Sequence, residues 1–273
     1  MHSLMPEYKI SKEVAQRSES GRWYNPETKK LVEEIIQKNG KPAPPSARHA
    51  TALGLVPSVT TILSEERHIG LERWKTEQLL MSALTVTRLP GESDSRLVRR
   101  ILQEADRPGK EAADEGTGMH KEFELYLATG IMPDNQRGFR MVSEINAFLR
   151  SKNWVAMHTE RQFASRKLGY AGTVDMDGLE QKTAMPWIGD IKTRDFKGDP
   201  KKVKPYDKYC TQMCAYAKGI NVVTDKMVSF MVDRETGMVK IREWTAYEIQ
   251  KHTRKWELLY ELWTLNHFDP RKT

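Results

Sequence analysis

Residues 187–193, with the sequence Trp-Ile-Gly-Asp-Ile-Lys-Thr, are predicted to form a partly buried β-strand. Asp190 and Lys192 are two residues apart, so their side chains point to the same face of this strand. A buried charge is costly unless it is paired, so an acid and a base on a buried face indicate a specific structural or functional role. Residues 173–179 form the preceding predicted strand, and Asp175 lies in it. If the two strands pair as a hairpin, Asp175 and Asp190 converge on one place in the sheet.

The segments around these strands predict an α/β or α+β core behind a helical N-terminal section. Apolar residues at helical spacing predict helices over 57–63, 70–85, 94–104, 110–129 and 136–151. Pro108-Gly109 is predicted to break or kink the chain between the third and fourth of these helices. Further along, the pattern predicts strands over 155–163, 227–233 and 239–244, a helix over 207–219 and a closing helix from Thr245 or Ala246.

The first 54 residues differ from the rest in composition. They are polar and poorly periodic, with a Gly/Asn-Pro turn over 18–30 between two short strands and a proline-rich loop or linker over 38–49. We therefore expect an N-terminal extension at 1–54 and one folded domain at 55–273.

Composition excludes several classes of protein. The chain has 273 residues, 38% of them apolar, and it contains seven Trp, nine Tyr and seven Phe, which a disordered chain would lack. It has no apolar run long enough to span a membrane and no signal or transit peptide pattern. Two cysteines exclude a disulfide scaffold and favour a reducing compartment. A soluble intracellular protein with a net charge of +7 is expected, and the charge alone is weak evidence for a polyanionic partner.

The paired carboxylates suggest metal-dependent hydrolysis. Asp175 and Asp190, together with a backbone carbonyl such as that of Ile191, are hard oxygen ligands of the kind that Mg²⁺ or Mn²⁺ prefers. Such an ion lowers the pKa of a bound water and stabilises charge on a phosphoryl oxygen. Lys192 is placed to hold the attacking water or to neutralise the developing charge, so all three side chains are candidate catalytic residues for phosphodiester hydrolysis.

Four motifs in order resemble the PD-(D/E)xK nuclease superfamily, in its RecB-like branch. They are Gly116-Thr-Gly-Met-His120, Gly172-Thr-Val-Asp175, Asp190-Ile-Lys192 and Gln212-x-x-x-Tyr216. Residues 57–63 followed by 71–75 further resemble the mitochondrial genome maintenance exonuclease group and its phage and bacterial relatives. The likeness covers about residues 55–220. The proline of the superfamily's PD signature is absent, as is the four-cysteine set of its iron–sulfur relatives.

The resemblance implies a restriction-endonuclease-like core, a central mixed β-sheet flanked by helices with a helical arch. It makes His120 an additional metal ligand and assigns Gln212 and Tyr216 to DNA contact and to ordering the site. Glu124, one turn after His120, and Glu160 are candidate supporting carboxylates, each about as well explained as a solvated acid. The cofactor expected is Mg²⁺ or Mn²⁺ and not an iron–sulfur cluster, because Cys210 and Cys214 alone cannot hold one.

A basic segment follows Lys192, with interleaved aromatic residues. Arg194, Lys201, Lys202 and Lys204 are candidate DNA-binding residues on a groove that tracks the phosphate backbone. By resemblance, the expected activity is a DNA exonuclease in recombination, repair or replication, favouring single strands, in the cytoplasm of a bacterial or phage-infected cell. A single-strand-binding or recombination protein is a candidate partner. A duplex-resecting exonuclease, a restriction-type endonuclease and a non-cleaving DNA-binding module remain open alternatives, as do the polarity of cleavage and the oligomeric state.

Overall fold

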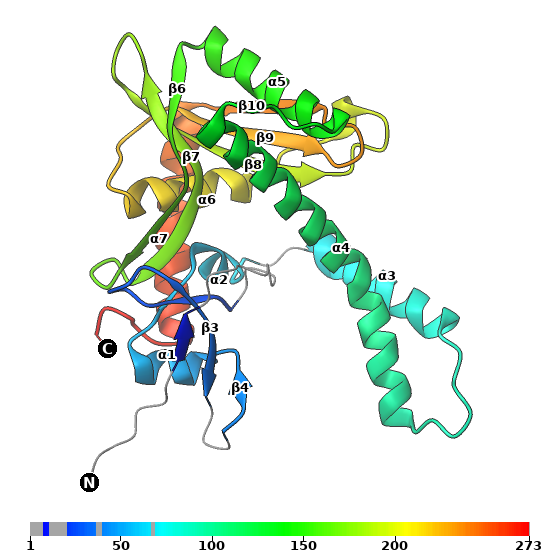
Figure 1. The fold of residues 1–273 in the computed structure, drawn as a ribbon. Coiled ribbons are helices and arrows are strands. Elements are labelled where there is room, and N and C mark those ends of the chain that lie inside the picture. The colour runs from blue at the N-terminus through cyan, green and yellow to red at the C-terminus, as the bar shows by residue number, and fades with distance from the viewer. Residues whose placement is uncertain (1–7, 11–20, 37–39, 67–68, 273) are drawn as a thin grey trace.

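A mixed five-stranded β-sheet forms the centre of the computed structural model, which describes residues 8–10, 21–36, 40–66 and 69–272 (Figure 1). Its strand order is β10-β9-β8-β7-β6. β8 and β9 are parallel, and the other neighbouring pairs are antiparallel. The strands are β6 (Trp154–Ser165), β7 (Tyr170–Glu180), β8 (Pro186–Arg194), β9 (Met227–Asp233) and β10 (Val239–Trp244). The chain is therefore an α/β protein, as the sequence predicts.

Helices cover both faces of this sheet. The C-terminal half of α4 (Asp94–Thr129) and α5 (Gln136–Ser151) pack on one face, over a core that contains the stacked rings of Trp154 and Trp187, 5.1 Å apart. The other face is covered by α6 (Asp207–Gly219) and α7 (Ala246–Asn266). β9 is buried along its whole length because it lies between these two layers.

A second, smaller sheet packs near the C-terminal end of α7 (Figure 1). Its members are β1 (Tyr8–Ile10), β2 (Trp23–Tyr24), β3 (Leu31–Ile36), β4 (Pro42–Ala43) and β5 (Val56–Pro57). Trp23 anchors it, with its ring 6.2 Å from that of Trp263 and stacked on Phe268 at 5.9 Å. α1 (Ala47–Leu53) joins β4 to β5 within this sheet, and α2 (Val59–Leu63) packs against α6, α7 and β7 of the main body. Ser58 caps α2 as its sequence predicts.

Two expectations for the N-terminal section are wrong. The segment 38–49, expected to be a loop or linker, contains β4 and the start of α1 among its described residues. The predicted break at Pro108-Gly109 is absent, because α4 is a single helix of 36 residues that continues through both; the alternative of a kink there stays a prediction. Proline in a helix interior costs roughly 3 kcal/mol. Packing of α3 (Ile69–Thr85) alongside offsets this cost, with Trp74 lying against Gly109.

α3 and the first half of α4 form an arm, residues 69–114, that projects away from the sheet (Figure 1). The same α4 helix then crosses onto the sheet and carries His120 there. The helical arch over the site stays a prediction, since this arm extends away from the sheet (Figure 1). Among the described helices, none is both long and apolar enough to cross a bilayer.

Candidate metal site between strands β7 and β8

The candidate site lies where β7 and β8 stop pairing. Their antiparallel ladder runs from Leu179↔Pro186 to Met176↔Gly189, and Asp175 and Asp190 are the next residues on each strand. Beyond this point β8 continues beside β9, and β7 continues beside β6. Here a side-chain hydrogen bond replaces the backbone hydrogen bonds between the two strands: Asp175 Oδ2 accepts from the backbone N–H of Ile191 at 2.8 Å. At this split, the point where β7 and β8 stop pairing, polar groups lie within an otherwise continuous sheet.

Three side chains at the split offer ligand atoms to one point. Single atoms of His120, Glu160 and Asp175 all lie within 4.8 Å of one another. His120 Nδ1 is 3.6 Å from Glu160 Oε1 and 3.9 Å from Asp175 Oδ2. The residues come from α4, β6 and β7, so helix-to-sheet packing assembles the group.

Gly116 allows α4 to approach β8 closely enough for His120 to reach the site. A Cβ atom at position 116 would lie 2.7 Å from Thr193 Oγ1, closer than real Cβ contacts allow. At Gly118, on the same helix, a Cβ would meet nothing within 4 Å. The first glycine of the Gly-Thr-Gly sequence thus has a packing role that the second lacks.

The His120 ring is oriented by the main chain of β8. Its Nε2 lies 2.9 Å from the Ile191 carbonyl oxygen, to which it donates, and this leaves Nδ1 facing Glu160 and Asp175. Metal-binding histidines commonly donate their other ring N–H to a backbone carbonyl in this way. Ile191, predicted as a ligand through its carbonyl, is therefore placed to orient His120.

Electrostatics at the site favour positive charge. Burial lowers the pKa of His120, but Asp175 and Glu160 outweigh it and raise the pKa to about 9. The pKa of Glu160 is raised by burial, and the neighbouring Asp175 and Glu124 carboxylates add to this. Without a cation, a proton on the imidazole is the charge that balances the two nearest carboxylates.

Glu160 takes a more central position than its sequence predicts. Its backbone φ is 47°, in the left-handed region that residues other than glycine rarely adopt. Such strain persists where the surroundings hold it, and it gathers at functional sites. In the β6–β7 ladder, Glu160 lies between the pairs Thr159↔Met176 and Arg161↔Val174, which sets it opposite Asp175. Sequence spacing contains no signal for this backbone turn.

Asp190 and Lys192 form a buried ion pair beside the group. Lys192 Nζ donates to Asp190 Oδ1 at 2.6 Å and lies 5.7 Å from the centre of the Tyr209 ring. Asp190 is 1% exposed, and its Oδ2 has no hydrogen-bond partner among the residues that the structure describes. Burial raises the pKa of Asp190 to about 7, against the opposing effect of Lys192. Asp190 does not belong to the three-residue group, although Asp175 and His120 both act on its charge.

These residues fit a divalent cation. A buried carboxylate oxygen without a partner is costly unless something else binds it. One imidazole nitrogen and several carboxylate oxygens suit Mn²⁺ well and Mg²⁺ through its oxygen ligands. The structure thus provides a candidate metal site of His120, Glu160 and Asp175, with Asp190 next to it.

Gln212 and Tyr216 lie inside the protein. They are 5% and 4% exposed, and Gln212 Nε2 donates to the Tyr216 hydroxyl at 2.6 Å. The Tyr216 ring packs on Gly172, where a Cβ would come within 2.7 Å of it. These positions favour a role in ordering β7 near Asp175; direct contact of either side chain with DNA stays a prediction.

The basic segment after β8 is held in place by polar contacts. Arg194 donates to the hydroxyls of Tyr209 and Tyr206, both at 3.1 Å, and its guanidinium lies 4.3 Å from the Tyr206 ring centre. Lys240 Nζ donates to the carbonyls of Pro200 and Val203, at 2.9 and 2.7 Å. This contact fixes the short helix η1 (Pro200–Lys202). The exposed lysines of this segment are Lys201 and Lys202 on η1 and Lys204 just after it.

The remaining candidates lie further from the three-residue group. Glu124 is exposed and acts on the site as a nearby charge that raises the pKa of Glu160. Cys210 and Cys214 are buried free thiols between α6 and the layers around it.

Comparison with known proteins adds little to this geometry. No protein-family model matches the chain, and no curated protein matches it. Among solved structures, one titled "Crystal structure of SSO0001" is 15% identical, over 70% of this chain and 87% of its own length, with a TM-score of 0.25. A similarity this low bears on neither the fold nor the activity.

Proposed function

We propose that this chain is a metal-dependent DNA exonuclease of the PD-(D/E)xK type, which hydrolyses phosphodiester bonds from free ends, with single strands as the favoured substrate. The observation that carries the proposal is the convergence of His120, Glu160 and Asp175 on one point, beside the Asp190–Lys192 pair. The order of the sequence motifs adds support, because the resemblance assigns the same positions to a nuclease site.

The bound cation would supply a water of lowered pKa and a positive charge on the phosphoryl oxygen. His120, Glu160 and Asp175 would hold it, and the buried Asp190 oxygen without a partner is the next available ligand. The Ile191 carbonyl keeps the imidazole oriented. A bound cation would take the place of the imidazole proton in offsetting the repulsion between the carboxylates, so cleavage is expected to require metal.

Lys192 is the residue we assign to the chemical step. Asp190 Oδ1 and the Tyr209 ring hold its ammonium group in place, so it needs no rearrangement when negative charge develops on the phosphate. A preorganised positive donor of this kind typically contributes a factor of about 100 to 1,000 to the rate. Lys192 is therefore a proton-bearing donor to the phosphate and not a metal ligand.

DNA as the substrate is supported by charge near the site. Arg194 and the lysines of η1 follow Lys192 directly along the chain, and Tyr206 next to them is 51% exposed. Phosphates are attracted by such a basic surface, and an exposed aromatic ring is a platform on which a base can stack.

The test is digestion of end-labelled single-stranded, duplex and covalently closed circular DNA, with Mg²⁺, Mn²⁺ or EDTA. The Asp190→Asn variant is run beside the wild type, and circular dichroism of both checks the fold. Loss of linear strands that requires metal and is absent in the variant would support an exonuclease and also report strand preference and polarity.

Other results would redirect the proposal. Cutting of circles would make the protein an endonuclease, and preference for duplex ends would favour a resecting enzyme. Binding of DNA with no cleavage under either metal would favour the non-cleaving module.

A further inference from the structure

Asp177 is a buried carboxylate that has no part in the proposed chemistry. It lies in β7 two residues after Asp175, and it is 5% exposed. Its two oxygens each accept a hydrogen bond from β6: Oδ1 from His158 Nδ1 and Oδ2 from Arg161 Nη1, both at 2.7 Å. Because burying a carboxylate is costly unless it is paired, these bonds fix the positions of both partners.

The backbone of β6 is irregular where it makes this contact. The β6–β7 register shifts between Ala156 and His158, so a β-bulge directly precedes His158. Bulges at sheet edges and beside active sites commonly redirect a side chain. Residues three apart in a regular strand face opposite sides, but Glu160, with its φ of 47°, interrupts the alternation between His158 and Arg161. Both side chains therefore reach Asp177.

Arg161 borders the candidate metal site on the side away from Lys192. It follows Glu160 directly in β6, and β7, which carries Asp175, lies between β6 and β8. Neighbouring strands lie about 4.8 Å apart, so the strands of Arg161 and Lys192 are at least about 10 Å apart. At a rise of about 3.4 Å per stacked nucleotide, this distance is a span of a few nucleotides.

Arg161 and Lys192 lie on one face of the sheet. Lys192 Nζ lies 5.7 Å from the centre of the Tyr209 ring on α6. Phe163, two residues after Arg161, packs on Tyr216 of the same helix, with ring centres 6.1 Å apart. Residues two apart in a strand share a face, so a single DNA strand can contact both Arg161 and Lys192 without passing through the sheet.

The guanidinium of Arg161 has donors left for a ligand. Asp177 binds its Nη1, and no other hydrogen bond or ion pair of Arg161 occurs among the residues that the structure describes. Its side chain is 38% exposed. A guanidinium carries five N–H groups in a rigid fork that matches phosphate oxygens, and a fixed fork loses less entropy on binding.

We propose that Arg161, held in place by Asp177, binds a backbone phosphate of the DNA strand a few nucleotides from the scissile bond. This proposal rests on the proposed nuclease function. Arg161 fixes the strand on the β6 side of the scissile phosphate, and the basic segment after β8 fixes it on the other side. Contacts on both sides hold the scissile phosphate at the metal site. Asp177 is a positioning residue.

The experiment measures binding of a fluorescent single-stranded oligonucleotide by anisotropy in EDTA, so that cleavage does not consume the DNA. In one series each phosphate in turn is replaced by an uncharged methylphosphonate. We expect Arg161→Gln to bind unmodified DNA about tenfold more weakly than the wild type. It should also lose the penalty that the wild type shows at one methylphosphonate position, and keep the penalties at the others.

Arg271→Gln is the matched control. Arg271 pairs with Asp269 at the same distance of 2.7 Å, near the C terminus of the chain. Its loss removes one paired arginine and one positive charge, as Arg161→Gln does. We expect this variant to keep both the affinity and the methylphosphonate profile of the wild type.

Asp177→Asn separates positioning from net charge. Removing a negative charge should by itself strengthen binding to DNA. Release of the Arg161 guanidinium should weaken it, and we expect this effect to dominate, with affinity about threefold lower. Circular dichroism of each variant checks the fold.

The possible failures are distinguishable. A wild type that binds no DNA would overturn the proposed function and this inference with it. A wild type that binds DNA, with Arg161→Gln unchanged in affinity and profile, would overturn this inference alone. Tighter binding by Asp177→Asn than by the wild type would also overturn it, because Asp177 would then act only through its charge.

Discussion

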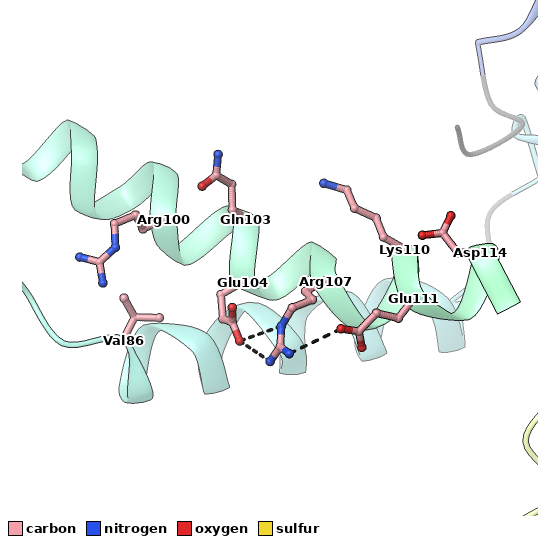
Figure 2. A pocket seen from close by; sticks show the side chains of 8 residues that line it. All are labelled: Val86, Arg100, Gln103, Glu104, Arg107, Lys110, Glu111 and Asp114. Atoms are coloured by element: carbon pink, nitrogen blue, oxygen red, sulfur yellow. Dashed lines mark hydrogen bonds and ion pairs between the residues drawn. The ribbon is translucent and has the colours of Figure 1, made fainter. Parts of the chain in front are cut away.

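The two halves of helix α4 lie in opposite electrostatic environments. In the half on the sheet, His120 faces two carboxylates within 4 Å, and the neighbouring Asp190 keeps one buried oxygen without a partner. In the half on the arm, residues 94–114, the charges are equal in number and paired at short range, as in Arg107–Glu104 and Arg107–Glu111 (Figure 2). The first arrangement gathers carboxylates around one imidazole, whereas in the second the acidic and basic side chains balance each other.

This difference separates a candidate chemical site from a surface whose charges are balanced. Buried charges that are not matched have large effects when one member is removed, because the others lose their compensation. Exposed pairs contribute roughly 0–1 kcal/mol each and act mainly through selectivity. Substitutions in the two halves should therefore differ in the size and kind of their effects.

The largest effect is expected from Lys192→Met. This change removes the ammonium group and keeps much of the side-chain length, so cleavage should fall about 1,000-fold while DNA binding stays largely intact. Single-turnover cleavage of labelled single-stranded DNA measures it. The Lys182→Met variant, at an exposed lysine in the turn between β7 and β8, is the control. Turnover retained by Lys192→Met would remove this residue from the chemistry.

A smaller effect is expected from Gly116→Ala. The added methyl group would lie 2.7 Å from Thr193 Oγ1, so the Thr193 side chain or α4 has to move; we expect α4 to shift from β8 and carry His120 with it. Affinity for Mn²⁺ should fall about tenfold, as is usual when a ligand's support is disturbed. Calorimetric titration with Mn²⁺ measures this change.

The matched change Gly118→Ala meets open space in the same helix. It should leave Mn²⁺ affinity unchanged and raise the free energy of unfolding by about 0.5–1 kcal/mol, because alanine favours helix. If both alanine variants bound Mn²⁺ like the wild type, Gly116 would not control the position of His120.

The smallest effect is expected from Lys201→Ala/Lys202→Ala on η1. Binding should weaken alike for all DNA sequences, and the slope of log affinity against log salt should fall by about 2. Fluorescence anisotropy at several salt concentrations measures it, with Lys29→Ala/Lys30→Ala as the control for loss of two exposed lysines. An unchanged slope would make η1 an ordinary solvated surface.

Much of the fold was predictable because apolar residues recur with a strong helix or strand period along the sequence. α5, α6, β9 and β10 have the predicted bounds, and α7 begins after its cap at Thr245. The five-stranded N-terminal sheet was largely beyond prediction, since its strands β2, β4 and β5 have only two residues each and show no period. The continuity of α4 was missed because the cost of Pro108 is local, whereas the packing that offsets it comes from α3.

The site was predictable in its members and less so in their roles. The spacing of Asp175 and Asp190 places them side by side at the end of the β7–β8 ladder. The left-handed backbone of Glu160 and the hydrogen bond from His120 to Ile191 depend on three-dimensional packing. No sequence pattern therefore reveals that Glu160 lies with His120 and Asp175, or that the Ile191 carbonyl accepts from His120. The burial of Gln212 and Tyr216 was hidden for the same reason.

The most direct test of the account is Mn²⁺ binding by Glu160→Gln compared with Glu124→Gln. Both substitutions remove one negative charge near His120, but only Glu160 belongs to the three-residue group. We expect the wild type and Glu124→Gln to bind Mn²⁺ with similar affinity and to gain thermal stability from it, and Glu160→Gln to bind about 100-fold more weakly. A wild type that binds no Mn²⁺, or two variants with the same affinity, would contradict the proposed metal site.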